Sequence, residues 1–210
     1  MYMAFKSSIT AEEIDGMSIA SFNGIVTVID SLGADYDSAI KYLSKQKTLG
    51  FDTETKPSFV ANSKRNHVAI LQLSGMDRAY IFRLNIIGLP IGLTSILSSN
   101  KIIKVGAAVN DDLNALQFHS KFQPKGFIDL QKIANRWGIE EKSVRKMAAI
   151  ILKMRVSKSQ QLSNWEIAEL TDAQISYAAI DAWVCQKMYL TLLSTPVRTN
   201  EQTYSKEGQG

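Results

Sequence analysis

Two acidic side chains stand one residue apart at the end of an otherwise apolar segment. They are Asp52 and Glu54 in FDTETKP, residues 51–57. In a β-strand, residues i and i+2 point to the same face, so the two carboxylates would project together. Close, unpaired carboxylates raise each other's pKa and cost stability unless a cation lies between them. The pair therefore favours a cation partner, although two solvated acids beside Lys56 would also fit this short stretch.

Further acids occur where close packing is expected. In SYAAIDAW, Tyr177 and Asp181 are four residues apart and share a helix face, which neighbouring alanines allow to approach a sheet. An acid on a packed face is unexpected unless it meets a metal or a base. In VGAAVNDDLNAL, an apolar strand leads into a helix that opens with Asp111 and Asp112. Either of these can be a capping residue, so this stretch alone leaves both interpretations open.

The segments that must position these residues alternate between β and α patterns. Residues 48–55, 67–74 and 78–84 are predicted to form an antiparallel meander, because only three residues separate the last two. Residues 19–31 are a candidate strand pair around Asn23-Gly24, a dipeptide typical of hairpins. Residues 101–108 are predicted to form a buried strand, and residues 127–138 a short strand followed by a helix.

Helices are predicted over 36–46, 91–100 and 110–120, and the pattern is helical from 143 onward. The last helix, 172–194, has a clear start, because Thr171 and Gln174 form a capping box. This order of elements predicts a mixed sheet flanked by helices.

The composition is that of one globular domain, predicted over residues 1–195. Of 210 residues, 45% are hydrophobic and 21% charged, and the net charge of +4 is compatible with a polyanionic partner without requiring one. The lone Cys185 predicts a buried structural thiol in a reducing compartment. With neither a signal peptide nor a membrane span in the pattern, we expect a cytoplasmic protein. Residues 196–210 contain few apolar side chains and are predicted to be disordered.

Taken together, residues 45–195 resemble the DEDD superfamily of 3'-5' exonucleases, in the tyrosine-containing (DEDDy) branch of ribonuclease D and the Werner exonuclease domain. FDTET is similar to the first motif, VGAAVNDDLNAL to the second and YAAID to the third. The resemblance implies a ribonuclease H-like α/β fold, with a mixed five-stranded sheet whose first three strands are antiparallel and with helices on both faces. It implies these catalytic residues: Asp52, Glu54, Asp112, Tyr177 and Asp181.

The four acids are predicted to hold two divalent ions, Mg²⁺ or Mn²⁺, which prefer oxygen ligands. One ion would activate water and the other would stabilise the leaving 3' oxygen. Asp52 is predicted to bridge the ions, Glu54 and Asp181 to hold the water-activating ion, and Asp112 to act partly through water. Tyr177, with an ordinary pKa of about 10, would orient the attacking water.

The implied activity is hydrolysis of phosphodiester bonds from the single-stranded 3' end of DNA or RNA, releasing nucleoside 5'-monophosphates. The alternative is a silent nuclease-fold module that binds nucleic acid or docks a protein, but a module freed from catalysis has little reason to retain all five residues. Length predicts a stand-alone exonuclease without an accessory domain.

Substrate contacts are predicted for a second group of residues, each of which could equally be structural: Thr53, Phe59, Leu116, Lys158, Gln161, Ser163 and Trp165. Phe59 and Leu116 could stack against the terminal base, although burial is the more frequent use of such residues. Asn164 stands where relatives often carry aspartate, which leaves its role open. His67 and His119 are predicted to be structural or surface residues.

Basic residues crowd the approach to the third motif, where a nucleic-acid backbone could lie, although a solvated helical face is equally consistent. They are Arg145, Lys146, Lys153, Arg155 and Lys158.

Overall fold

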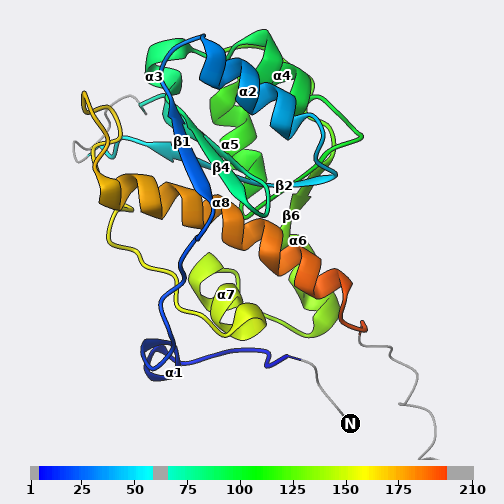
Figure 1. Cartoon of the computed structure of the whole chain (residues 1–210). Helices are drawn as coiled ribbons and strands as arrows, with labels where there is room; N and C mark the ends of the chain where they lie inside the picture. The colour runs from blue at the N-terminus through cyan, green and yellow to red at the C-terminus, as the bar shows by residue number, and fades with distance from the viewer. Residues whose placement is uncertain (1–4, 59–65, 198–210) are drawn as a thin grey trace, which may run out of the picture.

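Alternating apolar positions along the chain form a six-stranded mixed sheet that helices cover on both faces (Figure 1). The computed structural model describes residues 5–58 and 66–197. The strands are β1 Ile25–Ile29, β2 Thr48–Thr55, β3 Val68–Ser74, β4 Arg78–Phe82, β5 Ile103–Gly106 and β6 Phe127–Asp129. The helices are α1 Ala11–Asp15, α2 Ala34–Leu43, α3 Leu84–Ile87, α4 Ile91–Leu97, α5 Val109–Leu116, α6 Leu130–Ile133, the 3₁₀ helix η1 Ala134–Trp137, α7 Val144–Leu152 and α8 Asp172–Leu193.

The strand order is β1-β4-β3-β2-β5-β6. Strands β2, β3 and β4 form the predicted antiparallel meander. β5 pairs in parallel with β2, and β6 pairs in parallel with β5. The predicted fold class is confirmed. The sheet has six strands instead of five, because β1 adds to its edge parallel to β4.

The predicted hairpin around Asn23-Gly24 is wrong. Residues 25–29 are a single strand, and Ile19 instead forms a bridge with Arg155. Gly24 is needed for close approach, since a Cβ there would lie 2.3 Å from the carbonyl oxygen of Asp77. The amide of Ile25 donates to that same oxygen at 2.9 Å. The glycine therefore permits contact with the turn between β3 and β4 and makes no turn of its own.

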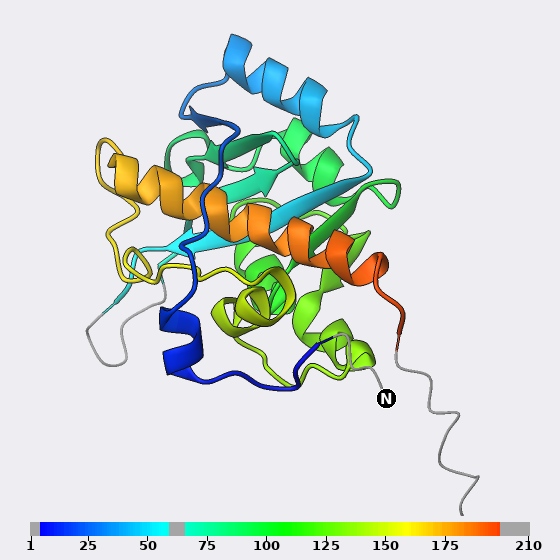
Figure 2. The ribbon, with the colours of Figure 1, turned by 60° about the horizontal axis from the view of Figure 1, so that its bottom comes forward.

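Two apolar layers hold the sheet between its helices. Helices α2, α4 and α5 cover one face, where Leu49 and Phe51 of β2 join the core. Helix α8 crosses the other face, and α7 packs beside it (Figures 1 and 2). The segment from α1 to β1 passes over α8 (Figure 2), where Phe22 lies 5.7 Å from Trp183 between ring centroids.

Helix α8 approaches β2 unusually closely. It begins with the predicted capping box of Thr171 and Gln174. A Cβ on Gly50 would lie 1.8 Å from the carbonyl oxygen of Ala182, so only glycine fits there. One turn along the helix, the Gln186 Nε2 donates to the carbonyl of Thr48 at 2.6 Å. Together these contacts fix the height and rotation of α8 over the strand.

The helical prediction from residue 143 onward holds only for α7 and α8. Helix α7 ends at Leu152, and the capping residue Lys153 has a left-handed backbone with φ 56°. Beyond it, Arg155 exchanges backbone hydrogen bonds with Ser18 and Ala20 at 2.9 and 2.8 Å. This pairing with a distant segment competes with helix formation. None of the helices in the described ranges is long and apolar enough to span a bilayer.

Candidate active site

The acidic end of β2 lies beyond the point where one neighbouring strand stops. β5 pairs only with Thr48–Gly50, while β3 continues alongside β2 to Thr55. A register shift between Glu54 and Thr55 marks an irregularity in the pairing with β3 at this end. The chain leaves β5 through Ala108, whose φ of 56° turns it into α5. The strand edge after Gly50 is therefore left open toward α5 and α8.

Three carboxylates converge at this open edge. Asp52 and Glu54 point to the α8 side of β2, and Asp181 comes from α8, one residue before the close approach at Gly50. One oxygen from each can be chosen so that all three lie within 4.8 Å of one another. The strand period of two and the close fit of Ala182 against Gly50 together bring these distant residues into one cluster.

Burial raises the pKa of every acid in the cluster, and repulsion between the acids raises the pKa of Asp52 and Glu54 further. Burial, followed by the charges of Asp181, Glu54 and Asp112, raises the pKa of Asp52 well above its ordinary value. The pKa of Glu54 is raised to about 8 by burial and by the charges of Asp181 and Asp112. Burial raises the pKa of Asp181 to about 7. At neutral pH the cluster therefore holds either protons or a cation.

Asp112 joins the cluster from the opposite side of β2. Thr53 points toward α5, and its Oγ1 donates to Asp112 Oδ1 at 2.6 Å. Burial raises the pKa of Asp112 to about 6, and the hydrogen bond from Thr53 opposes that rise. Asp112 is not one of the three acids in the tight group, but its charge acts on both Asp52 and Glu54.

Tyr177 stands one helical turn before Asp181 and is hydrogen-bonded to its carboxylate. Burial, then the charges of Asp181 and Glu54, raise the pKa of Tyr177. Its hydroxyl is therefore a donor near neutral pH. Trp165 is fully buried 6.0 Å behind the phenol ring, between ring centroids, and limits where the ring can lie.

Sequence reasoning missed two polar residues around the cluster. Gln72 pairs directly with Asp52 across the strands and is buried, and its amide atoms have no partner among the described residues. In the sequence, Gln72 could have been found as the single amide side chain in the apolar run VAILQLS. Asp129, at the end of β6, accepts from the amides of Ala108 and Gln131 and raises the pKa of Asp112 by its charge. In the sequence, Asp129 could have been found as an acid at the end of a short predicted strand.

Cys185 lies one turn beyond Asp181 on the same helix. It is a free, buried thiol, as predicted. Burial, and then the charge of Asp52, raises the pKa of this thiol.

The predicted substrate contacts are not all close to the cluster. Phe59 lies outside the described residues, as does most of the predicted tail. Leu116 and Trp165 are fully buried in the core. Gln161 is exposed, and the half-buried Ser163 donates to Gln160 at 2.5 Å. Their roles toward a substrate stay predictions.

The remaining polar candidates have local partners. Asn164 accepts from the amide of Glu166 at 3.1 Å, which closes a turn before α8. The His119 Nε2 lies 2.8 Å from the carbonyl oxygen of Val68, and the His67 ring lies 5.9 Å from that of His119. Both histidines line a cavity of about 770 Å³ beside Glu166. These contacts agree with the structural roles expected for the histidines.

The donor set fits a hard divalent cation. It consists of carboxylate oxygens whose mutual repulsion is already expressed in raised pKa values, and a positive ion at the cluster would relieve that repulsion. No lysine, arginine or histidine of the described residues forms an ion pair with Asp52, Glu54 or Asp181. A cation from solution is therefore the natural counter-charge.

Comparisons with known proteins point the same way. The sequence profile described as 3'-5' exonuclease matches residues 31–195. Mouse exonuclease 3'-5' domain-containing protein 2 is 33% identical over 125 residues, which cover 57% of this chain and 19% of that protein.

Two solved structures share the fold. The EXO domain of Nibbler from Aedes aegypti superposes with a TM-score of 0.71 at 22% identity, covering 83% of this chain and 91% of that one. Ribonuclease D from Trypanosoma brucei, solved with RNA U12, gives a TM-score of 0.71 at 18% identity, covering 83% and 64%.

The cluster and this match define a class: the chain belongs to the 3'-5' exonuclease family. Its fold is that of the ribonuclease H-like exonuclease domains among its structural neighbours. The chain spans between 19% and 62% of the length of the first three curated relatives.

Proposed function

We propose that this protein is a divalent-metal-dependent 3'-5' exonuclease, which removes nucleoside 5'-monophosphates one at a time from a free, single-stranded 3' end. The observation that carries the proposal is the convergence of three carboxylate oxygens within 4.8 Å at the open edge of β2. Membership of the 3'-5' exonuclease family supports the direction of cutting.

The position of each acid in the cluster indicates which metal ion it would hold. The charges of Asp181, Glu54 and Asp112 all act on Asp52. We therefore propose that Asp52 would be a ligand of both metal ions. Glu54 and Asp181 would hold one of them, and Asp112, tied to Thr53, would contribute from the other side of the strand. When bound, two Mg²⁺ or Mn²⁺ ions supply an activated water and stabilise the charge of the leaving oxygen.

Tyr177 is proposed to orient the attacking water. Its pKa is raised, so near neutral pH it keeps its proton and is a poor base. Its hydroxyl already donates toward the cluster, and the packing of Trp165 keeps the ring from turning away. The phenol is therefore suited to fix the position of a hydrogen-bond partner at the acids.

Membership of the exonuclease family supports a nucleic acid substrate, and we propose both DNA and RNA as candidates. A neighbour by fold, the ribonuclease D of Trypanosoma brucei, was solved with RNA. Selection of one sugar rests on contacts to the 2'-hydroxyl, which small polar or backbone groups can make. The preference for one sugar is measured by comparing DNA and RNA strands in the same assay.

The test uses single strands of DNA and RNA, labelled at either the 3' or the 5' end, with Mg²⁺, Mn²⁺ or a chelator. The 3' label should be released first as a mononucleotide, and the 5' label should appear on a ladder of shortening products. Asp52→Asn should be inactive because it removes a central charge of the cluster. Asp30→Asn, which neutralises an exposed acid, is the matched control.

Two results would contradict the proposal. Digestion that persists in chelator would remove the metal requirement, and equal digestion by Asp52→Asn and parent would remove the cluster from the reaction. A protein that binds strands but degrades none of them under any metal would instead be the silent binding module.

A further inference from the structure

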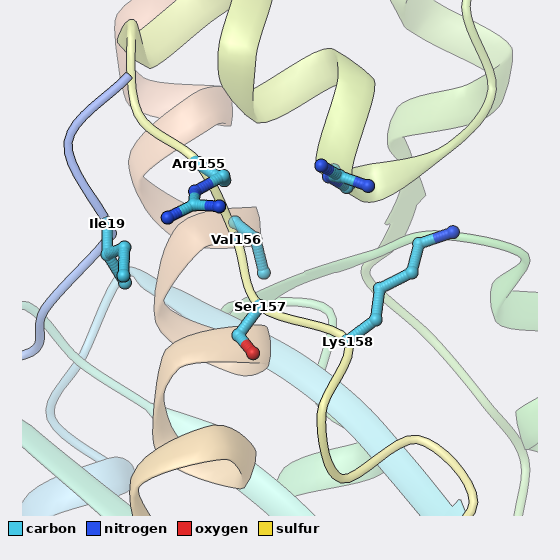
Figure 3. A pocket seen from close by; sticks show the side chains of 6 residues that line it. Ile19, Arg155, Val156, Ser157 and Lys158 are labelled. Carbon is cyan, nitrogen blue, oxygen red and sulfur yellow. The ribbon is translucent and has the colours of Figure 1, made fainter. Parts of the chain in front are cut away.

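A second polar pocket lies away from the acids, where the chain leaves α7. Its volume is about 200 Å³, and it is lined by Ile19, Arg145, Arg155, Val156, Ser157 and Lys158. Figure 3 shows Arg155 and Lys158 extending on either side of Val156 and Ser157, with Ile19 next to Arg155. Three of the six lining side chains are basic, which favours a negatively charged ligand.

Segments far apart in the sequence hold this pocket open. Backbone hydrogen bonds join Arg155 to Ser18 and Ala20. Val156 is anchored in the core beside α8. The walls are therefore fixed by the fold, whereas Lys158 stays exposed at the rim.

The two arginines, Arg145 and Arg155, share one acidic partner and keep hydrogen-bond donors that have no partner among the described residues. Asp15 accepts from Arg145 at 2.6 Å and lies 3.9 Å from Arg155, and it is the acid paired with both. The Nε atoms of both arginines are buried and have no hydrogen-bond partner among the described residues. Lys158 has no ion pair within the described part of the chain. One acid thus faces three cations, which leaves an excess of two positive charges.

We propose that this pocket binds a backbone phosphate of the strand being degraded, further toward the 5' end than the phosphate that is cut. The inference rests on the proposed function. A phosphate group can accept from guanidinium donors in a paired, charge-assisted geometry, which carboxamides and neutral ligands cannot match. The space equals that of about seven waters, enough for a phosphate with its hydration but small for a packed base and sugar.

The position in the chain favours a strand over a free anion. Lys158 begins the segment that leads to Trp165, and Trp165 packs behind Tyr177 of the cluster. Pocket and cluster therefore flank one connecting segment beside α8. A strand with its 3' end at the acids has a phosphate at each preceding nucleotide to place in such a pocket.

The test compares long and short substrates. Arg145→Gln/Arg155→Gln should raise KM for a strand of about twelve nucleotides about tenfold and leave kcat unchanged, because it removes charge-assisted hydrogen bonds. A dinucleotide with a free 5'-hydroxyl should show no change, because its only phosphate is the one that is cut. Lys45→Gln/Lys47→Gln is the matched control, since it removes two exposed charges near the end of α2.

A second variant avoids removing the contacts of Asp15. Ile19 is 61% exposed, so Ile19→Glu should leave the melting temperature unchanged and place a negative charge beside Arg155. It should weaken binding of the long strand in the same way. The slope of log Kd against log salt should fall by about 0.7 for each phosphate of a single strand that the pocket no longer neutralises.

Binding by anisotropy, in an Asp52→Asn background, is measured apart from hydrolysis. Absence of hydrolysis by every form overturns the proposed function, whereas unchanged binding of the long strand by both pocket variants overturns the pocket alone. Equal losses for dinucleotide and long strand would also overturn it. If inorganic phosphate inhibited the parent equally on both substrates but spared the arginine variant, the pocket would be a free-anion site and not a strand contact.

Discussion

The metal-free protein should lose stability as the pH rises from about 6 to about 8, because the acid cluster must then ionise without a counter-charge. The folded-state pKa values of Asp181 and Glu54 are about 7 and about 8. The unfolded values are about 3.9 and about 4.3. Since the folded-state values are raised, the folded state binds more protons in this window. The stabilising effect of those protons is present at the lower pH and is lost as the pH rises through each folded value.

For Asp181 alone, this loss amounts to about 1.4 kcal/mol between about pH 6 and about pH 8. Glu54 taken by itself would lose about 2 kcal/mol on the same basis. The two acids repel each other, so their losses share one interaction and the total should be nearer 2 kcal/mol than their sum. At this chain length, a loss of that size lowers the melting temperature by roughly 4–8 °C.

The assay is thermal unfolding in chelator at the two pH values, repeated with Mn²⁺. Asp52→Asn/Asp181→Asn should flatten the pH dependence and unfold at a higher temperature than the parent at the higher pH. Asp30→Asn/Glu169→Gln removes two exposed acids and should keep the parental slope. Mn²⁺ should stabilise the parent more at the higher pH, where protons compete less for the carboxylates. A parent whose slope in chelator equals that of the double cluster variant would refute the reasoning.

Three further changes probe the support of the site. Tyr177→Phe keeps the ring against Trp165 and should lower kcat by about 100-fold or more, with Mn²⁺ affinity unchanged in a direct titration. Thr53→Val removes the hydrogen bond that lowers the pKa of Asp112, so the Mn²⁺ concentration for half-maximal activity should rise about tenfold. Gly50→Ala forces a methyl group to 1.8 Å from a carbonyl oxygen of α8 and should cost about 3 kcal/mol in urea unfolding.

Each of these has an outcome that speaks against it. A Tyr177→Phe enzyme with parental kcat would show that the hydroxyl does not act in the rate-limiting step. Parental metal dependence in Thr53→Val would show that Asp112 needs no fixed orientation. Gly16→Ala is the control for the glycine change, since a Cβ there meets nothing closer than 3.8 Å and its φ is −76°. Equal stability of the two alanine variants would contradict the tight contact.

Local patterns predicted the parts of the fold that depend on local physics. The alternation in residues 48–55 gave the bounds of β2 and placed Asp52 and Glu54 on one face. The capping box at Thr171 gave the start of α8. The meander followed from the short connection between β3 and β4.

Features that depend on distant contacts were not predicted. Gly24 is typical of a turn in sequence, but its small size serves contact with Asp77 in the distant turn between β3 and β4. The helix after residue 143 stops where Arg155 pairs with residues near Ser18. The basic pocket combines Ile19 with Arg155, so no local window contains it. Periodicity describes one segment at a time and cannot report which distant segment competes for its backbone.

One helix carries Asp181, the close contact with Gly50 and the buried thiol of Cys185. The reagent-accessible state of that sulfur therefore requires α8 to lift from the sheet, and lifting it also dismantles the acid cluster. The rate of alkylation of the sole cysteine in this sequence therefore reports how often the acid cluster comes apart, and the measurement needs no substrate. Any ion that holds the acids together should slow the alkylation of Cys185.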